Sequence, residues 1–361
     1  MRHGVPAPAP DIIPGTRQLE RTDNKMATIR DVAQLAGVGV ATASRVISGT
    51  GSFSAAAAER VRAAAAELGF RPSNVARALS LQSTGTIGVY VPDFRGPFYG
   101  PMLDAIDGEL RRHGRHMVAV NGIGDVDARQ QALSSAEFLA DRECDGIIIA
   151  SNELRDADYI AIRQRIKHVA IINREVKGMK TQCFTVNHRH GGALAAKSLL
   201  EHGHKRLAVI SGLAHAQDNR QRMEGFFETV RAAGLDPDTF PVIHADFTAP
   251  GGWAATEELL ARKTKFTGLF CANDQMAMAA ISKLDAAGKS VPEDISVVGY
   301  DNTDMGAYLR PRLTTVDTHI GEMGLNACRL LVNQCYGKDL SIARDFPPTF
   351  VPRDSLRKIG R

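Results

Sequence analysis

The chain has 361 residues, 44% of them hydrophobic and 23% charged, and its formal net charge is +4 at pH 7. This composition is ordinary for a globular protein with room for a small domain and a larger core. No apolar run reaches the roughly 20 residues that cross a bilayer, so we expect no membrane-spanning segment.

Residues 1–25 are rich in Pro and Ala and then become charged. They contain no apolar run of the kind that a secretory signal needs. We therefore predict that residues 1–25 form a disordered N-terminal extension.

The stretch TIRDVAQLAG predicts a first short helix. Thr28 is suited to the N-cap, apolar residues follow at helical spacing, and Gly37 is suited to the turn that ends the helix. A second helix is predicted directly behind this turn.

The second helix, VGVATASRVIS, has two unlike sides. Its residues predicted to be buried are Ala43, Val46 and Ile47, and those predicted to be presented are Ala41, Ser44 and Arg45. A helix, a short turn with glycine and a second helix form the motif that sets a recognition helix into the major groove of DNA.

The stretch SAAAAERVRAAAAELGF predicts a third helix, with Ser54 as N-cap and Gly69 at its end. Arginines outnumber acidic residues between residues 26 and 83, which favours an anionic partner. The next stretch, RPSNVARALSLQSTG, is basic and amphipathic but too short to form a stable helix alone in water. We expect it to fold when a partner holds it.

From Gly85 onward, apolar runs of strand length alternate with segments of helix length. This alternation predicts buried parallel strands with crossover helices. The predicted strands lie in TIGVYVP, HMVAVNG, DGIIIAS, HVAIINR, RLAVISG, GLFCAND and ISVVGYD. Polar residues follow the strands at the sheet edge where such folds bind ligands, and they are Asp93, Asn121, Ser151, Asn173, Asn273 and Asp301.

Several segments together carry a resemblance to a known family. In order and spacing, ATIRDVAQLAGVGVATASRVISG, RPSNVARALS, TIGVYVPDFRGPFYGPM, GHKRLAVISG, QRMEGF, CANDQMAMAAI, VPEDISVVGYDNT and PRLTTV resemble the lactose and galactose repressor (LacI/GalR) family of bacterial regulators. INR, PFYG, PRLTTV and the Val-Ala pair at residues 40–41 resemble its galactose-repressor branch most.

The resemblance implies an N-terminal all-α helix-turn-helix headpiece with a hinge helix, followed by an α/β core of two Rossmann-like lobes like that of periplasmic binding proteins. The implied boundaries are residues 26–72 for the headpiece, 73–84 for the hinge helix and linker, and 85–361 for the effector-binding and dimerisation domain. Within that domain the N-lobe covers about 85–187 and 318–348, and the C-lobe covers about 188–317 and 349–361.

The resemblance also implies which residues contact DNA. Arg45 can donate two hydrogen bonds to a guanine edge, and Val40 or Ala41 can rest on a thymine methyl group. The family's hinge leucine, which wedges between central base pairs, corresponds to Leu79. The implied DNA-binding residues are Thr28, Val40, Ala41, Thr42, Ser44, Arg45, Ser54, Ser73, Asn74, Ala76 and Leu79.

Some of these assignments have simpler alternatives. The Ser and Thr hydroxyls could cap helices instead of contacting phosphates, and Leu79 could pack against its own domain. The chain also departs from the family where Gly39, Ala43 and Ser48 replace the usual Ser, Val and Asn, which puts one phosphate contact and some packing in doubt.

For the cleft, Arg222 in QRMEGF stands where the family's arginine grips the effector, although a charge there could also lie in a solvated helical turn. Phe247 resembles the aromatic residue that stacks on the effector ring, and Tyr99 could instead belong to the core. The implied effector-binding residues are Phe98, Tyr99, Asn173, Asp218, Arg222, Phe247, Asn273, Gln275, Asp301 and Thr318.

Other patterns have ordinary interpretations. His188 with His190, and His202 with His204, have H-x-H spacing, but GHKRL resembles the family's turn into a strand, so we predict no metal site. NGIGDV lacks the third glycine and the acidic residue of a dinucleotide site, and we predict no cofactor. The cysteines lack C-x-x-C spacing and are interpreted as buried small hydrophobes of a reduced cytoplasm, and they are Cys144, Cys183, Cys271, Cys328 and Cys335.

Three classes of protein fit parts of this pattern: a ligand-responsive repressor, a periplasmic binding protein and a sugar or nucleotide enzyme. The headpiece, the missing export signal and the lack of a catalytic motif favour the repressor. We expect a cytoplasmic, nucleoid-associated homodimer that binds palindromic operator DNA and a small sugar-like effector, with no enzyme activity and no membrane contact. The identity of the effector and the sign of its effect on DNA binding stay open.

Overall fold

The structure is a computed structural model that describes residues 27–49, 51–70, 83–122 and 127–360. The chain divides into two compact units, Met1–Leu81 and Gln82–Arg361. The predicted extension 1–25 lies outside the described residues. None of the described helices has the length and apolarity needed to span a membrane.

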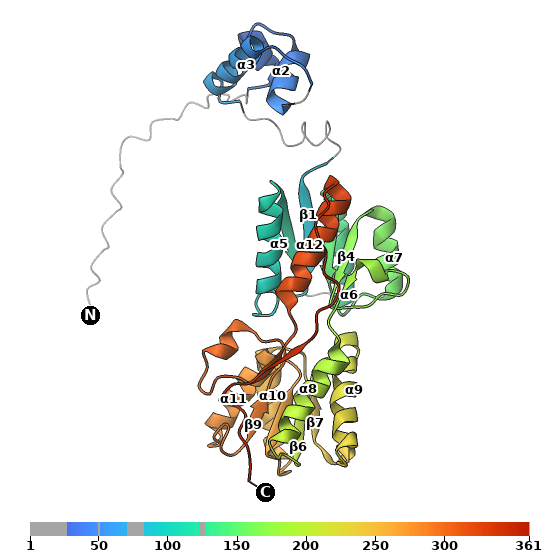
Figure 1. Ribbon diagram of the computed structural model, residues 1–361, viewed down its shortest axis with the longest axis vertical. Coiled ribbons are helices and arrows are strands. Elements are labelled where there is room, and N and C mark those ends of the chain that lie inside the picture. The colour runs from blue at the N-terminus through green and yellow to red at the C-terminus, as the bar shows by residue number, and fades with distance from the viewer. Residues whose placement is uncertain (1–26, 50, 71–82, 123–126, 361) are drawn as a thin grey trace, which may run out of the picture. The chain divides into compact units, whose positions relative to one another are not determined.

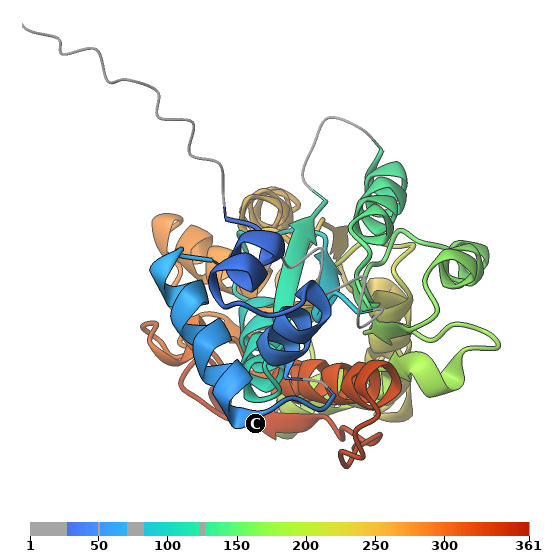
Figure 2. The same ribbon diagram turned by 90° about the horizontal axis from the view of Figure 1, so that it is seen from above.

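In the N-terminal unit, the three blue helices of Figures 1 and 2 pack around a small core. They are α1 (Ile29–Leu35), α2 (Val40–Ser48) and α3 (Ala55–Glu67). The cap of α1 is a capping box, in which Asp31 N donates to Thr28 Oγ1 and Thr28 N donates to Asp31 Oδ2. The predicted helix-turn-helix is confirmed.

The N-caps of α2 and α3 differ in whether a side chain forms a capping hydrogen bond. Ser54 Oγ accepts a hydrogen bond from Ala57 N at 3.2 Å and caps α3. Gly39 stands at the N-cap of α2 and offers no side-chain bond. Gly37 adopts a φ of +62°, which glycine tolerates and which makes the sharp turn between α1 and α2 possible.

The first lobe of the second unit is built on a parallel sheet with strand order β2-β1-β3-β4-β5. Alternate residues of each strand enter different cores, so that Ile148 packs beneath α5 and α12 while Ile147 packs beneath α6 and α7. Burial of both faces explains the continuous apolar runs. The strands are β1 (Thr86–Val91), β2 (His116–Asn121), β3 (Gly146–Ala150), β4 (Val169–Ile172) and β5 (Cys183–Phe184), and the helices are α5 (Gly100–Arg112), α6 (Ala128–Asp141), α7 (Asp156–Arg165) and α12 (Ile320–Tyr336).

The second lobe repeats this architecture with a parallel sheet of order β7-β6-β8-β9. Helices α8 and α9 pack on one face and α10 and α11 on the other. The strands are β6 (Leu207–Ser211), β7 (Val242–His244), β8 (Gly268–Cys271) and β9 (Ser296–Val298), and the helices are α8 (His188–Glu201), α9 (Gln217–Ala232), α10 (Ala249–Ala261) and α11 (Asp274–Ala286). Short 3-10 helices lie at Lys180–Gln182, Pro237–Thr239 and Asp304–Ala307.

The chain passes between the lobes more than once. After β9 it returns to the first lobe through β10 (Thr315–Asp317), and it leaves again through β11 (Thr349–Val351), which pairs with β10 in antiparallel fashion. Between these strands lies α12, which Figure 1 shows in red among the teal and green elements of the first lobe. The following segment is fixed in the second lobe, where Ser355 Oγ donates to Val297 O at 2.7 Å.

The strands that the sequence predicted are all present, but β5, β7, β10 and β11 were missed. Each of these has two or three residues. Such short segments carry no periodic pattern that could be read from the sequence.

Candidate functional site

The outer side of α2 is open to solvent in the N-terminal unit. Val40 is 46% exposed, Ala41, Ser44 and Arg45 are also exposed, and Thr42 is partly buried. Ala43 and Val46, by contrast, are buried in the small core. The face that the sequence predicted for base contacts is therefore free to meet a ligand.

The predicted phosphate contacts divide into two groups. Thr28 and Ser54 are exposed and already serve as helix caps, so the capping interpretation holds for both, and their contact with phosphate stays a prediction. The predicted hinge contacts lie outside the described residues, and they are Ser73, Asn74, Ala76 and Leu79.

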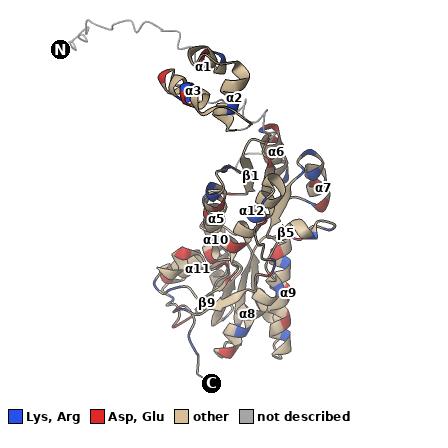
Figure 3. Cartoon of the chain, turned by 45° about the horizontal axis from the view of Figure 1, so that its top comes forward, with Lys and Arg blue, Asp and Glu red and all other residues tan. Residues whose placement is uncertain are grey.

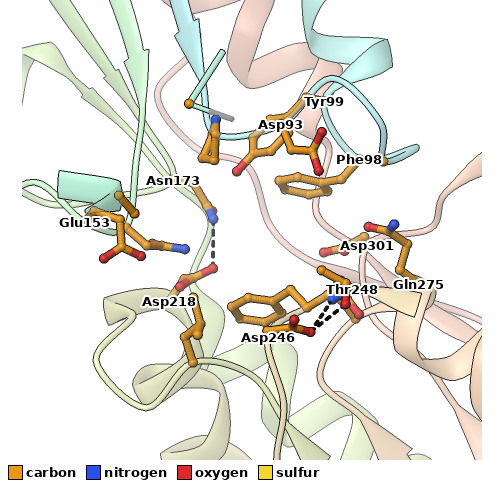
Figure 4. Close-up of a pocket in the computed structure, with 18 of the residues that line it drawn as sticks. Asp93, Phe98, Tyr99, Glu153, Asn173, Asp218, Asp246, Thr248, Gln275 and Asp301 are labelled. Carbon is orange, nitrogen blue, oxygen red and sulfur yellow. Dashed lines mark hydrogen bonds between the residues drawn. The ribbon is translucent and has the colours of Figure 1, made fainter. Parts of the chain in front are cut away.

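In the second unit, a cavity of about 240 Å³ lies where the carboxyl ends of both sheets meet. Every predicted effector residue except Thr318 lines it, with contributions from both lobes (Figure 4). The predicted residues in its wall are Phe98, Tyr99, Asn173, Asp218, Arg222, Phe247, Asn273, Gln275 and Asp301.

Some predicted positions do not reach the cavity. Thr318 is 1% exposed and its buried hydroxyl has no hydrogen-bond partner among the described residues. Of the polar residues at strand ends, Asn121 and Ser151 are also absent from the wall, because Asn121 ends the edge strand β2 and Ser151 Oγ accepts from Glu153 N within its own loop. The structure therefore does not place these three residues in the wall of this cavity.

The wall also contains residues that the sequence analysis missed. Tyr90, Glu153, Asp246 and Thr248 line the cavity, and three of these lie outside regular elements. Tyr90 belongs to strand β1, which was predicted, but the sequence does not show to which face of the sheet the Tyr90 side chain points. A polar residue in a loop gives no periodic signal, and no sequence motif would have assigned Glu153 to the site.

Three wall residues adopt a left-handed backbone that is unusual for side chains other than glycine. The φ angles are +61° at Asn173, +68° at Phe247 and +118° at Asp301. Each such residue costs on the order of 1–3 kcal/mol, and such residues concentrate at functional sites. Backbone bonds hold them in place, including Asn173 N to Phe184 O at 2.8 Å.

Arg222 is 2% exposed and reaches the cavity from α9. Its guanidinium carbon lies 3.7 Å from the centre of the Tyr300 ring, Nη1 donates to Ala272 O, and Nη2 lies 3.5 Å from Asp218 Oδ2. Nε is buried and has no partner among the described residues. Arg222 is thus a buried cation, not part of a solvated turn, and it retains one free donor.

His188 is a buried residue beside the cavity wall that the sequence analysis left without a function. It is 1% exposed, and Nε2 lies 2.7 Å from Asn173 Oδ1 while Nδ1 lies 3.1 Å from the Tyr300 hydroxyl. Burial and the nearby Arg222 lower the pKa of His188 well below its usual value, so the ring is neutral. Its place at i, i+3 and i+4 from small buried residues of α8 was the available signal.

These groups form one connected path of hydrogen bonds. In the neutral ring Nε2–H donates to Asn173, the Asn173 amide then donates from Nδ2 to Asp218 Oδ2 at 3.0 Å, and Tyr300 donates to His188 Nδ1. In this path, each group's donor and acceptor roles are fixed by the group to which it is hydrogen-bonded. The first lobe and the second lobe are linked by this path, because Asn173 follows β4 and Asp218 lies on α9.

Helices α8 and α9 approach closely at glycines. A Cβ atom built on Gly192 would overlap the carbonyl group of Arg222, and one on Gly225 would overlap that of Arg189. The close crossing brings His188 on α8 beside Arg222 on α9. These glycines are therefore needed for the geometry of the cavity wall.

Two further histidines of the H-x-H patterns, His202 and His204, make structural contacts. His204 Nε2 lies 3.1 Å from Arg357 O, and His202 Nδ1 lies 2.7 Å from Ser198 O. In the part of the chain that the structure describes, no group of His, Cys, Asp and Glu could hold a metal ion. Burial raises the pKa of Cys328 to about 12, and all the cysteines are free.

Comparison with known proteins gives matches over both units. Residues 28–73 match the model of "Bacterial regulatory proteins, lacI family", and residues 196–356 match that of "Periplasmic binding protein-like domain". The HTH-type transcriptional regulator GalR of Escherichia coli K12 is 33% identical over 332 residues, covering 92% of this chain and 96% of that protein. The repressor PurR of Aliivibrio salmonicida is 32% identical over 338 residues, covering 92% of this chain and all of that protein.

Comparison with solved structures also gives regulators of the LacI family. A transcriptional regulator of the LacI family from Burkhoderia phymatum is 44% identical, with a TM-score of 0.74 and coverage of 76% of this chain and 99% of that one. The lac repressor dimer bound to operator and the anti-inducer ONPF is 27% identical, with a TM-score of 0.80 and coverage of 92% and 99%.

Proposed function

The chain belongs to the lacI family of bacterial regulatory proteins and is a transcriptional regulator rather than an enzyme, and on that premise we propose which surfaces it uses. It represses genes of sugar metabolism by binding operator DNA through α2, and a small sugar-like effector in the cavity between the lobes lowers its affinity for that DNA. It acts in the cytoplasm, on the DNA of the nucleoid.

The observation that supports DNA reading by α2 is its two-sided burial. Ala43 and Val46 anchor the helix in the small core, and Arg45 stands on the open side with freedom to donate to a guanine edge. Val40 and Ala41 present apolar surface at the start of the same helix, where recognition helices contact bases. Thr28, Thr42 and Ser54 are placed at helix starts from which hydroxyls reach phosphates.

The cavity supports the effector part of the proposal. Its wall combines aromatic rings from Phe98 and Phe247 with amide and carboxylate groups, as sites for polyhydroxylated rings do. Because the wall comes from both lobes, a ligand that contacts both favours the closed arrangement, and it shifts the equilibrium by its differential affinity for the closed and open states. The hinge segment transmits that shift to the headpieces of the dimer.

The dimer implies a palindromic operator, because two identical headpieces related by a twofold axis read two half-sites. Two Leu79 side chains would enter the central minor groove and favour a pyrimidine–purine step there. Light scattering of the protein and footprinting on operators with altered centres test this: a tetramer, or indifference to the central step, would contradict it.

The main experiment selects DNA sites from a randomised library with the full chain and then measures fluorescence anisotropy of the selected site. Sugars, sugar acids, sugar phosphates and nucleobases are added in turn. We expect a palindromic site and its release by a sugar. No sequence preference in the selection would overturn the DNA part of the proposal, and release by a nucleobase alone would overturn the effector part.

A further inference from the structure

The Asp301 carboxyl group is buried in the cavity wall without a hydrogen-bond partner. The residue is 8% exposed, it faces the cavity in Figure 4, and nothing in the described part of the chain donates to its side chain. A carboxylate taken out of water in this way costs free energy unless another group compensates its charge. Burial and the nearby Asp218, Asp274 and Asp317 raise the pKa of Asp301 well above its usual value, even though Arg222 lowers it.

The cavity wall contains further acidic side chains besides Asp301. Carboxylates outnumber the guanidinium of Arg222 in the wall, and they belong to Asp93, Glu153, Asp218, Asp246 and Asp301. Elsewhere, for example along α9, Figure 3 shows acidic and basic residues interspersed. The excess of negative charge is therefore a property of the cavity wall.

The cationic side chains near the wall already pair with other wall carboxylates and not with Asp301. Asp93 pairs with Arg95 at 3.0 Å, and Glu153 accepts from His215 at 2.9 Å, in both cases with residues outside the wall. Arg222 shares its Nη2 with Asp218 and its Nη1 with Ala272 O. Asp301 and Asp246 are left without a salt-bridge partner among the described residues.

We propose that the effector is a small polyhydroxylated ring that carries a cationic amine, as amino sugars do, and that its ammonium group pairs with Asp301. This inference rests on the proposed function, in which the cavity binds the effector. An ammonium group supplies charge-assisted hydrogen bonds to the buried carboxylate, which a hydroxyl group cannot match in strength.

The remaining wall fits the rest of such a ligand. The cavity of about 240 Å³ is below the roughly 300 Å³ at which pockets for drug-sized ligands begin, so a single ring suits it better than a disaccharide. Asn173 and Gln275 offer amides to hydroxyl groups, and the rings of Phe98 and Phe247 offer apolar surface. A ligand with a carboxylate or phosphate group would meet the carboxylates of the wall and is disfavoured.

Thermal shift and calorimetry on the full chain test the inference. The probes are D-glucosamine, D-galactosamine and D-mannosamine, each compared with its neutral hexose, its N-acetyl form and the corresponding uronate. We expect at least one amine to bind about tenfold or more tightly than its neutral and N-acetyl counterparts, since a hydrogen bond between charged groups is stronger than one between neutral groups. Asp301→Asn should remove this preference, whereas Asp304→Asn, an exposed neighbour outside the wall, should keep it.

Several outcomes would overturn the inference: equal or tighter binding of the neutral hexose or the uronate, no binding of any amine, or an unchanged preference in Asp301→Asn. Operator binding is measured in parallel to separate the two proposals. If neutral hexoses release the operator and amines do not, the regulatory function stands and this inference fails. If amines bind but the chain has no preferred DNA site, this inference stands and the proposed function fails.

Discussion

His188 Nε2 lies 2.7 Å from Asn173 Oδ1, so a buried neutral imidazole on α8 sets the direction in which an amide of the cavity wall points. The Asn173 Nδ2 group is thereby aimed at Asp218, and its carbonyl oxygen is occupied. A side chain that does not line the cavity thus decides which hydrogen bonds the cavity can offer.

We expect His188→Ala to weaken effector binding and to leave operator binding intact, because Asn173 loses the partner that orients it. Loss of one buried hydrogen bond of this kind costs about 1–3 kcal/mol, which corresponds to about 5- to 150-fold in affinity. His190→Ala on the same helix is the control, since His190 is exposed. Calorimetry with the releasing sugar measures both variants, and equal affinities would contradict the positioning role.

The lowered pKa of His188 predicts a pH dependence of stability. The unfolded chain takes up a proton near the usual pKa of 6.5, and the folded chain does so at a much lower pH, so stability is complete above pH 6.5 and falls as the pH drops below it. In His188→Gln the free energy of unfolding should fall less steeply with acid, by up to about 1.4 kcal/mol per pH unit. Denaturant unfolding between pH 5 and 7 measures the slopes. His190→Gln should retain the wild-type slope, and parallel slopes in His188→Gln would disprove the assignment.

Arg222→Lys tests whether the Arg222 guanidinium binds the effector. Lysine keeps the charge but loses the planar stacking on Tyr300 and the fork of donors. Operator binding should persist, and the sugar concentration for half-maximal release should rise at least about tenfold. Anisotropy titrations measure this, with Arg220→Lys on the exposed side of α9 as control. An unchanged midpoint would remove Arg222 from the effector site.

Arg45→Lys tests base reading without removing charge. A lysine can still attract phosphates, but it cannot form the two parallel bonds of a guanidinium on guanine. The specific site should lose about 1–3 kcal/mol of binding free energy while non-specific DNA is bound nearly as before. Competition anisotropy with both DNAs measures the difference. Equal losses on the two would place Arg45 at a phosphate.

Gly192→Ala tests the close crossing of α8 and α9. The new methyl group would overlap the backbone of Arg222, and overpacking of this kind costs about 1–3 kcal/mol or more. We expect a lower melting temperature and weaker effector binding together. Gly100→Ala, where the added atom meets nothing within 4 Å, should leave both unchanged. A fully stable Gly192→Ala would show that the helices can separate without loss.

The strands and the headpiece were predictable because burial imposes a period on the sequence. Ile147, Ile148 and Ile149 form an unbroken apolar run, since their strand is covered on both faces. The two sides of α2 were likewise visible at helical spacing. Most of the cavity could be predicted through the family resemblance, which relates positions such as Arg222 and Asp301 that lie far apart in the sequence.

What could not be predicted depends on the path of the backbone. Glu153 and Asp246 reach the cavity because of loop geometry that follows no period. Thr318 matched the family but its side chain is enclosed beside the crossing strands. His188 was weighed in the sequence only for its H-x-H spacing, which was rejected as a metal site, whereas its buried position on α8 decides its contacts.

The interleaving of the two lobes along the chain has a consequence during synthesis. The first lobe needs α12, which follows the whole second lobe in the sequence, and the second lobe needs Ser355, which follows α12. On the ribosome, the first lobe therefore stays incomplete until α12 has emerged and the second lobe until Ser355 has emerged, whereas α1 to α3 are complete by residue 67. A nascent chain that stalls, or one that is cut before that point, therefore carries a complete set of headpiece helices on an incomplete core.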